Sequence, residues 1–200
     1  MKAKTLQKSG NHKVLIAEDN DKTRQFLKTQ LEVMGFDVVG SVDNGREAVE
    51  LVEKLNPGIV IMDIKMPEMD GIEAARAISS KKTIPIILIT GLSSGEVASQ
   101  AIDAGVFAYL IKPVTKKQLE PAIELAMARY EEFNSLKSEV DDLKDAIETR
   151  KLVERAKGIL MKRCNLNEDD AFKVLQSHSQ KENKKMREIA ESIVSASKLI

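Results

Sequence analysis

Five polar residues of this sequence have the types and the placement that phosphoryl chemistry needs. Glu18 and Asp19 directly follow one short apolar segment, Asp63 follows another, and Thr90 and Lys112 end two more. Three carboxylates brought together repel one another unless a divalent cation neutralises them, and a small set of hard oxygen ligands favours Mg²⁺. An aspartate beside Mg²⁺, an ammonium group and a hydroxyl can accept a phosphoryl group, because these groups stabilise the transferred oxygens.

These residues must be positioned by alternating strands and helices. Five short segments predict strands, several of them apolar throughout as buried parallel strands are: Val14–Ala17, Asp37–Ser41, Ile59–Met62, Ile86–Thr90 and Ala108–Ile111. Helical patterns lie between them near residues 21–34, 44–55, 70–79 and 94–104, and a fifth begins after Pro113. Strict alternation predicts an α/β fold with a five-stranded, doubly wound parallel sheet. Taken singly, each acid would be an ordinary loop residue, but all five polar residues fall at carboxyl ends of strands, where such sheets bind ligands.

A long apolar stripe follows the last predicted strand. Its residues are spaced by three or four, with one extra three-residue step after Phe133: Leu119, Ile123, Ala126, Tyr130, Phe133, Leu136, Val140, Leu143 and Ile147. This spacing predicts a coiled-coil-like helix over residues 119–147 through which two copies dimerise. The alternative is a helix that packs its stripe on its own domain.

The rest of the chain predicts a small three-helix bundle. One helical segment runs to about Arg163 and is broken by Cys164-Asn165. Asn167 is the expected N-cap of the second helix, and a third helix begins at about Asn183.

Charge is unevenly distributed along the 200 residues, although 31 basic and 31 acidic side chains give a net charge of zero. Residues 1–12 carry +3 and residues 13–130 carry −3, from 14 basic and 17 acidic side chains. Residues 131–148 hold seven acids and two lysines, a net of −5, whereas residues 149–165 hold six basic residues and one acid, a net of +5. The neutral total therefore does not exclude a nucleic-acid partner.

Several protein classes are unlikely on composition. A single cysteine, Cys164, excludes an intrachain disulfide. The longest apolar run, Ile84–Ile89, is far shorter than the ~20 residues that span a bilayer, so no membrane partner is expected. Met1–Lys13 has no apolar core of a signal peptide. We therefore expect a cytoplasmic protein with a flexible basic tail over residues 1–12.

The first part of the chain resembles the receiver domain of two-component response regulators, a flavodoxin-like fold, over about residues 13–130. The matching pieces are Val14–Asn20, Ile61–Gly71, Ile89–Gly91 and Lys112-Pro113. The resemblance implies that a sensor histidine kinase phosphorylates Asp63. It also implies that Glu18, Asp19, Asp63 and the backbone carbonyl of Lys65 hold Mg²⁺.

The same resemblance assigns a switch pair to the receiver domain. Thr90 and Tyr109 match its two positions. The threonine hydroxyl would move toward the phosphoryl group, and the tyrosine ring would turn inward behind it.

The last part resembles an ANTAR domain, the RNA-binding module of response-regulator antiterminators, over about residues 139–197. Ala156-Lys157-Gly158 and Ala171-Phe172 agree with its pattern, whereas Thr149 stands where serine is frequent and Asn165 where glycine is usual. We expect Phe172 to lie in the core, and Gly158 to allow the close approach of a helix or of RNA.

The resemblance implies that dimers bind paired stem-loops of nascent transcripts and prevent the terminator hairpin from forming. Nine basic residues are candidates for RNA contact: Arg150, Lys151, Arg155, Lys157, Lys162, Arg163, Lys184, Lys185 and Arg187. Charge alone would equally fit a solvated surface balanced by the acidic segment before it.

The sequence therefore predicts a response regulator that acts as an antiterminator on hairpin RNA and forms a homodimer when Asp63 is phosphorylated. The alternative is a DNA-binding transcription factor. No enzymatic activity is expected beyond self-catalysed phosphoryl transfer and slow hydrolysis at Asp63, because residues 131–200 contain no nucleophile–base pair or cluster of metal ligands.

Overall fold

The computed structural model describes residues 12–91 and 95–197. The chain divides into two compact units, Met1–Phe133 and Asn134–Ile200, and each is described by itself. Of the tail predicted over residues 1–12, all but His12 lies outside the described residues.

The first unit is built around a parallel sheet of five strands. These are β1 (Lys13–Ala17), β2 (Asp37–Val42), β3 (Ile59–Asp63), β4 (Ile86–Thr90) and β5 (Ala108–Ile111). They lie in the order β2-β1-β3-β4-β5, and every neighbouring pair is parallel. The predicted five-stranded parallel sheet is confirmed.

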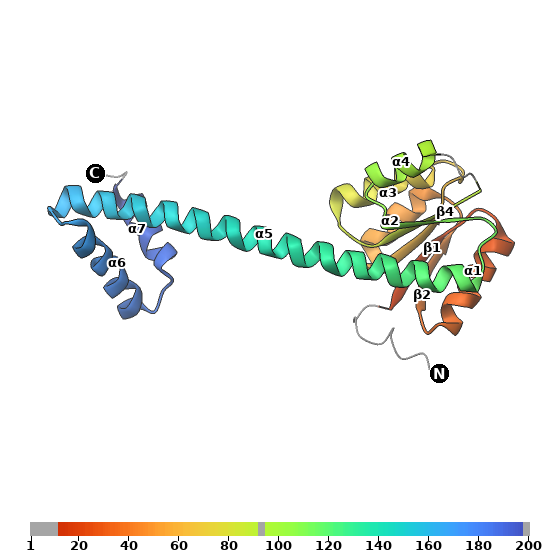
Figure 1. The fold of residues 1–200 in the computed structure, drawn as a ribbon, viewed down its shortest axis with the longest axis horizontal. Helices are drawn as coiled ribbons and strands as arrows, with labels where there is room; N and C mark the ends of the chain where they lie inside the picture. Colours follow the sequence, from red (N-terminus) through yellow and green to blue (C-terminus); the bar gives the residue numbers. More distant parts are fainter. Residues whose placement is uncertain (1–11, 92–94, 198–200) are drawn as a thin grey trace. The chain divides into compact units, whose positions relative to one another are not determined.

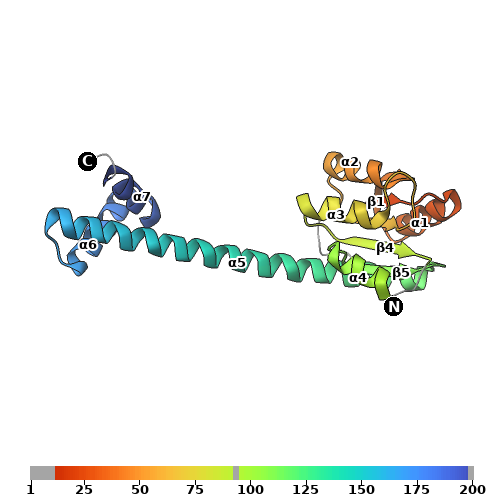
Figure 2. The same ribbon diagram turned by 90° about the horizontal axis from the view of Figure 1, so that it is seen from above.

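Helices cover both faces of this sheet (Figures 1 and 2). They are α1 (Asp21–Val33), α2 (Gly45–Leu55), α3 (Gly71–Lys81), α4 (Gly95–Asp103) and α5 (Lys116–Cys164). Leu27 and Leu31 of α1 pack with Leu119 and Ile123 of α5 against one face, whereas α2, α3 and α4 pack against the other. Each fully buried leucine or isoleucine contributes about 1.5–3 kcal/mol, so these two apolar layers hold the strand ends in place.

Short loops with strong N-caps connect the strands to the helices. The Asn20 side chain caps α1 by accepting a hydrogen bond from Thr23 N (3.1 Å), and the Asn44 side chain caps α2 by accepting one from Glu47 N (2.8 Å). Asp70 caps α3 by accepting from the backbone N–H groups of the first turn. Because each cap satisfies N–H groups that the helix leaves without partners, the helices begin close to the strand ends.

The second unit is a small helical bundle. The last part of α5 packs with α6 (Glu168–Glu182) and α7 (Met186–Ser197) around an apolar core. Its buried members are Val153, Ala156, Leu175, Ile189, Ala190 and Val194. The predicted three-helix bundle is confirmed.

Asparagine residues mark where these helices begin and end. Asn165, directly after α5, has a left-handed φ of 54°, and the Asn167 side chain accepts from Asp170 N (2.8 Å) at the start of α6. The third helix begins at Met186 rather than at Asn183. Asn183 is in the left-handed conformation and ends α6 instead.

The predicted apolar stripe on α5 has two different environments. Leu119, Ile123 and Ala126 are buried in the core of the first unit. This part of the helix therefore packs on its own domain, as the alternative prediction stated. From Phe133 to Ile147 the apolar side chains are exposed in the single chain. Among the described residues, no helix is long and apolar enough to cross a membrane.

Substitution of Gly71 tests the close packing at the end of β3. A Cβ atom on Gly71 would lie 2.1 Å from the backbone carbonyl oxygen of Asp63, so something must shift. We expect Gly71→Ala to lower the free energy of unfolding by about 1–3 kcal/mol, as overpacking does, measured by urea unfolding of the full chain. The control is Gly95→Ala, because its added Cβ would meet no atom of the other described residues within 4 Å, apart from its chain neighbours and its own helix backbone. Unchanged stability of Gly71→Ala would contradict this packing.

Candidate functional site

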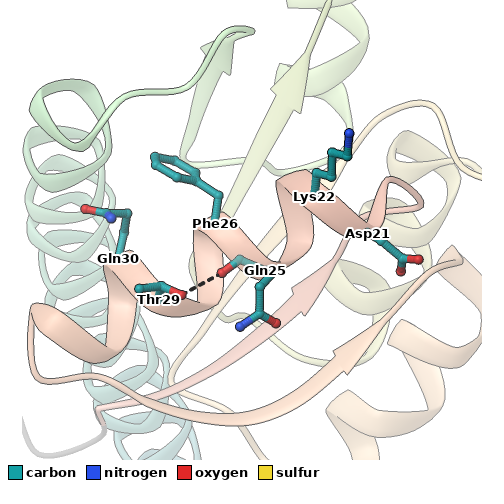
Figure 3. Close-up of a pocket in the computed structure, with 6 residues that line it drawn as sticks. All are labelled: Asp21, Lys22, Gln25, Phe26, Thr29 and Gln30. Atoms are coloured by element: carbon teal, nitrogen blue, oxygen red, sulfur yellow. Dashed lines mark hydrogen bonds between the residues drawn. The ribbon is translucent and has the colours of Figure 1, made fainter.

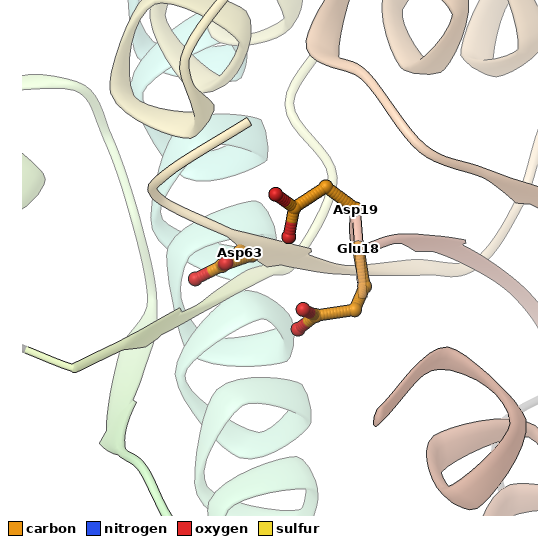
Figure 4. A group of neighbouring side chains, drawn as sticks. All are labelled: Glu18, Asp19 and Asp63. Atoms are coloured by element: carbon orange, nitrogen blue, oxygen red, sulfur yellow. The ribbon is translucent and has the colours of Figure 1, made fainter. Parts of the chain in front are cut away.

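Three carboxylates converge at the carboxyl ends of β1 and β3. Glu18 and Asp19 directly follow β1, and Asp63 is the last residue of the neighbouring strand β3. One carboxylate oxygen from each lies within 4.8 Å of the others (Figure 4). Glu18 and Asp63 are buried and Asp19 is exposed. The structure thus brings together the three acids that the sequence singled out.

Lys112 binds two of these carboxylates. Its Nζ atom donates to Asp63 Oδ2 at 2.8 Å and to Glu18 Oε1 at 3.0 Å. Burial would lower the pKa of Lys112, but the hydrogen bonds to Asp63 and Glu18 outweigh it and raise the pKa above its usual value. The side chain is therefore an ammonium ion at neutral pH. Lys112 directly follows β5, and its backbone N donates to Thr90 O at 2.7 Å.

The pocket still has an unpaired buried oxygen and an excess of negative charge. Glu18 Oε2 is buried and has no hydrogen-bond partner. Burial raises the pKa of Glu18, so its ionised form is disfavoured by folding. Its stabilising contribution is complete below the ordinary glutamate pKa and is lost as the pH rises through the raised value. One ammonium group does not balance three carboxylates. A hard divalent cation would, so the residues present fit Mg²⁺.

The other predicted residues of the receiver pocket lie around these acids. Thr90 is the last residue of β4 and is buried. Lys65 lies in the exposed loop two residues beyond Asp63. Tyr109 on β5 pairs in register with Leu88, and its side chain is 48% exposed. The switch role of Thr90 and Tyr109 stays a prediction.

Arg24 is a residue of this site that sequence analysis missed. From α1, its Nη1 donates to the backbone carbonyl oxygens of Glu18 (2.5 Å) and Asp19 (3.4 Å), and its Nη2 pairs with Asp21. It therefore fixes the backbone that carries both acids. The carbonyl oxygens that it binds have no signature in a sequence, so only its spacing from Glu18 could have suggested this contact.

A shallow hollow lies along the exposed face of α1. Figure 3 shows its six lining residues, which are Asp21, Lys22, Gln25, Phe26, Thr29 and Gln30, and the hydrogen bond from the Thr29 hydroxyl to Gln25 O (2.9 Å). A second hollow shares Lys22 and Phe26 and also includes Lys112, Pro113 and Val114. The surface of α1 therefore adjoins the residue that binds Asp63.

In the second unit, Lys157 differs from the other predicted RNA contacts because it is buried. Its side chain is 9% exposed, and Nζ lies 2.8 Å from both Glu154 Oε1 and Glu168 Oε1. The hydrogen bonds to Glu154 and Glu168 raise the pKa of Lys157. This lysine joins α5 to the first turn of α6 rather than facing solvent.

Three further candidates for RNA contact form ion pairs or hydrogen bonds within the chain. Arg187 pairs with Asp145, Glu148 and Glu191, and Lys184 pairs with Glu182 at 2.7 Å. Arg163 Nη2 donates to the backbone carbonyl of Ser197 at 3.1 Å. Five candidates remain that are exposed and have no carboxylate partner within the described part of the chain: Arg150, Lys151, Arg155, Lys162 and Lys185.

The structure contradicts the expectation for Phe172 and one of the two expectations for Gly158. Phe172 is 41% exposed, so the expectation that it lies in the core is wrong. A Cβ atom on Gly158 would meet no neighbouring atom within 4 Å, so within the described residues no other helix approaches it closely. An approach by RNA stays a prediction.

Comparisons with known proteins cover both units. A family model described as a response regulator receiver domain matches residues 14–124, and one described as an ANTAR domain matches residues 141–194. The chain is 45% identical over 182 residues to the transcriptional regulatory protein PdtaR of Mycobacterium tuberculosis, covering 91% of this chain and 89% of that protein.

Two other similar proteins cover a smaller share of the chain. The regulatory protein AtoC of Escherichia coli is 36% identical over 139 residues, which are 69% of this chain and 29% of that protein. The crystal structure of the signal receiver domain of a modulated diguanylate cyclase from Desulfovibrio desulfuricans is 37% identical, with a TM-score of 0.55. It covers 60% of this chain and 95% of its own.

The two family models match successive parts of the sequence, and the similarity to PdtaR extends through both. The chain accordingly belongs to the two-component response regulators that join a receiver domain to an ANTAR domain, the RNA-binding module of antiterminators.

Proposed function

We propose that a sensor histidine kinase phosphorylates Asp63 and that this event controls binding of hairpin RNA in nascent transcripts, so that the protein acts as a transcription antiterminator in the cytoplasm. The observation that carries the proposal is the Lys112 ammonium held 2.8 Å from Asp63 beside two further carboxylates. An acid needs these neighbours to accept a phosphoryl group.

The residues of the pocket have different roles in phosphoryl transfer. A carboxylate oxygen of Asp63 forms the new O–P bond as the bond from phosphorus to the kinase histidine breaks. Glu18, Asp19, Asp63 and the Lys65 carbonyl would hold Mg²⁺, which supplies positive charge for the transferred oxygens. Lys112 donates to the phosphoryl group, and the Thr90 hydroxyl can donate a further hydrogen bond. We propose no chemical activity of the chain beyond transfer to Asp63 and slow hydrolysis there.

The helical unit supplies the RNA-binding surface in this proposal. Arg150, Lys151, Arg155 and Lys162 are exposed on α5, and Lys185 is exposed just before α7. Exposed cations without acidic partners are free to bind phosphates and release counterions. Lys157 has a structural role instead, because two carboxylates already hold its ammonium group. A homodimer formed on phosphorylation would present two such surfaces to two hairpins.

Asp63→Asn tests the phosphorylation step. In the presence of a small-molecule phosphoryl donor and Mg²⁺, the unsubstituted protein should dimerise and bind a two-hairpin leader RNA more tightly. Asp63→Asn keeps the size of the side chain but cannot form the acyl phosphate, so we expect both responses to disappear. Sedimentation velocity and RNA titration measure them. The matched control Asp37→Asn, at an exposed position on β2, should respond like the unsubstituted protein. An Asp63→Asn protein that still responds to the donor would refute the proposal.

Mg²⁺ should raise the melting temperature of the receiver domain, because it binds the folded pocket only. The gain should shrink as the pH falls through the raised pKa of Glu18, since a proton then competes with the cation. Thermal unfolding with and without Mg²⁺, at neutral and at mildly acidic pH, measures this. Glu18→Gln should be more stable than the unsubstituted protein without Mg²⁺ and should gain less from it. An equal gain at both pH values would contradict the site.

Lys151→Met and Lys157→Met make the same chemical change on the same helix, and they separate a contact from a structural residue. Lys151→Met should weaken hairpin binding and reduce the slope of log affinity against log salt by about 1. Lys157→Met should leave that slope unchanged, because its ammonium group is buried and paired. Filter binding over a salt series, with duplex DNA as competitor, measures both effects. Equal slope changes would contradict the assignment, and preference for duplex DNA would favour a DNA-binding transcription factor.

A further inference from the structure

The loop between β3 and α3, residues 64–70, carries part of the proposed Mg²⁺ site. It begins directly after Asp63 and contains Lys65, whose backbone carbonyl is a proposed ligand of the metal. The base of the loop is closed by the backbone N–H of Gly71, which donates to Ile64 O at 2.8 Å. Lys65 itself is exposed, so its placement depends on what holds the middle of the loop.

The middle of this loop contains a strained turn. Glu68 has a left-handed φ of 63°, and across it the backbone N–H of Met69 donates to Pro67 O at 2.7 Å. A three-residue turn with this hydrogen bond and a positive central φ is the rare, strained form of the γ-turn. Glycine adopts such a φ without steric cost, whereas glutamate does not. A strained conformation of this kind persists only where the surrounding structure imposes it.

The first two residues of α2 hold the strained turn. The backbone N–H of Gly45 donates to Met69 O at 3.2 Å. A Cβ atom on Gly45 would lie 2.5 Å from the same oxygen, so helix and loop approach too closely for any side chain. Arg46 Nε lies 3.3 Å from Glu68 Oε2. The strained residue therefore supplies a carboxylate that pairs with α2, which a glycine at this position could not do.

Helix α2 is anchored independently of these contacts. Its N-cap residue Asn44 is buried and donates from Nδ2 to Asp43 Oδ1 at 2.9 Å. Ala48 and Val52 of α2 are buried in the same apolar core as Ala74 of α3. Because the helix is fixed by its own cap and core residues, the loop takes its conformation from the helix.

We propose that Gly45 and Arg46 are positioning residues for Mg²⁺ binding, which hold the β3–α3 loop in the conformation that the Lys65 carbonyl needs as a metal ligand. Neither residue is itself a ligand. The inference rests on the proposed function in taking the acidic pocket and the Lys65 carbonyl as the Mg²⁺ site. Groups that orient metal ligands without touching the metal typically change its affinity about 10- to 100-fold when they are lost.

Gly45→Ala in the full chain tests the close approach of α2 to the loop. Met69 O must move away from the new methyl group, so we expect Mg²⁺ to bind about tenfold more weakly or worse. Isothermal titration calorimetry with magnesium chloride measures the affinity, and circular dichroism shows that the variant is folded. The matched control is Gly95→Ala, at the first residue of α4, where the added Cβ meets no other described atom within 4 Å. A folded Gly45→Ala protein with the affinity of this control would overturn the proposal.

Arg46→Met gives a second test, in which the direction of the change is decisive. Loss of a positive charge would by itself favour a bound cation. Loss of the contact with Glu68 should instead weaken Mg²⁺ binding, by about two- to fivefold for an exposed ion pair. The control Lys54→Met removes a cation of the same helix that pairs with Glu50, and it should bind Mg²⁺ at least as tightly as the unsubstituted protein. Unchanged or tighter binding by Arg46→Met would contradict its positioning role.

A charge swap shows whether the contact itself matters. Arg46→Glu and Glu68→Arg each place like charges together, so each should weaken Mg²⁺ binding. The protein with both changes restores the pair and should regain an affinity within about twofold of the unsubstituted protein. Arg46→Lys, which keeps a cation at this position, should also bind more tightly than Arg46→Met. A double variant as weak as the weaker single variant would overturn the role of the pair.

Asp19→Asn separates this inference from the proposed function. It removes a proposed ligand, so Mg²⁺ binding should be lost whatever holds the loop. If Asp19→Asn binds Mg²⁺ like the unsubstituted protein, the proposed metal site itself is wrong. If Asp19→Asn loses Mg²⁺ whereas Gly45→Ala and Arg46→Met retain it, only the positioning role of α2 is refuted.

Discussion

The ammonium group of Lys112, held between the buried carboxylates of Asp63 and Glu18, is the interaction around which the receiver domain is arranged. Two acids with limited access to water would repel each other without it, and even with it the pKa of Glu18 stays raised. The carboxyl ends of three strands, β1, β3 and β5, must lie close enough for hydrogen bonding if this contact is to form. The parallel register of β1, β3, β4 and β5 and the two apolar layers of helices achieve that placement.

Much of the receiver domain was predictable because buried parallel strands are short apolar runs. β4 and β5 have the predicted bounds, and the other three strands differ by one residue at one end. The acids of the site were predictable for the same reason, since polar residues at strand ends stand out. Arg24 was not, because its partners are backbone carbonyls. Lys157 was not, because a lysine that pairs across two helices has the same sequence context as one that faces solvent.

The helical unit shows that burial and pairing, rather than the number of basic residues, define a candidate nucleic-acid surface. Six of the nine cations lie in one short stretch of α5 and three lie around the start of α7, yet carboxylates from neighbouring helices pair with Lys157 and Arg187. The acidic segment before the basic one supplies Asp145 and Glu148 for Arg187. Part of the acidic charge thus stabilises the bundle, and the exposed cations of α5 stay without acidic partners in the described structure.

The exposed apolar side chains of Leu136, Val140, Leu143 and Ile147 on α5 also bear on how a single chain behaves in solution. Four large exposed aliphatic side chains on one helix form an apolar strip, and such a surface favours aggregation with unfolded or partly folded chains. The seven acids of residues 131–148 surround this strip with net negative charge. Like net charge on such segments opposes their nonspecific association. An exposed apolar surface and the charge that opposes its nonspecific association therefore lie within the same eighteen residues of α5.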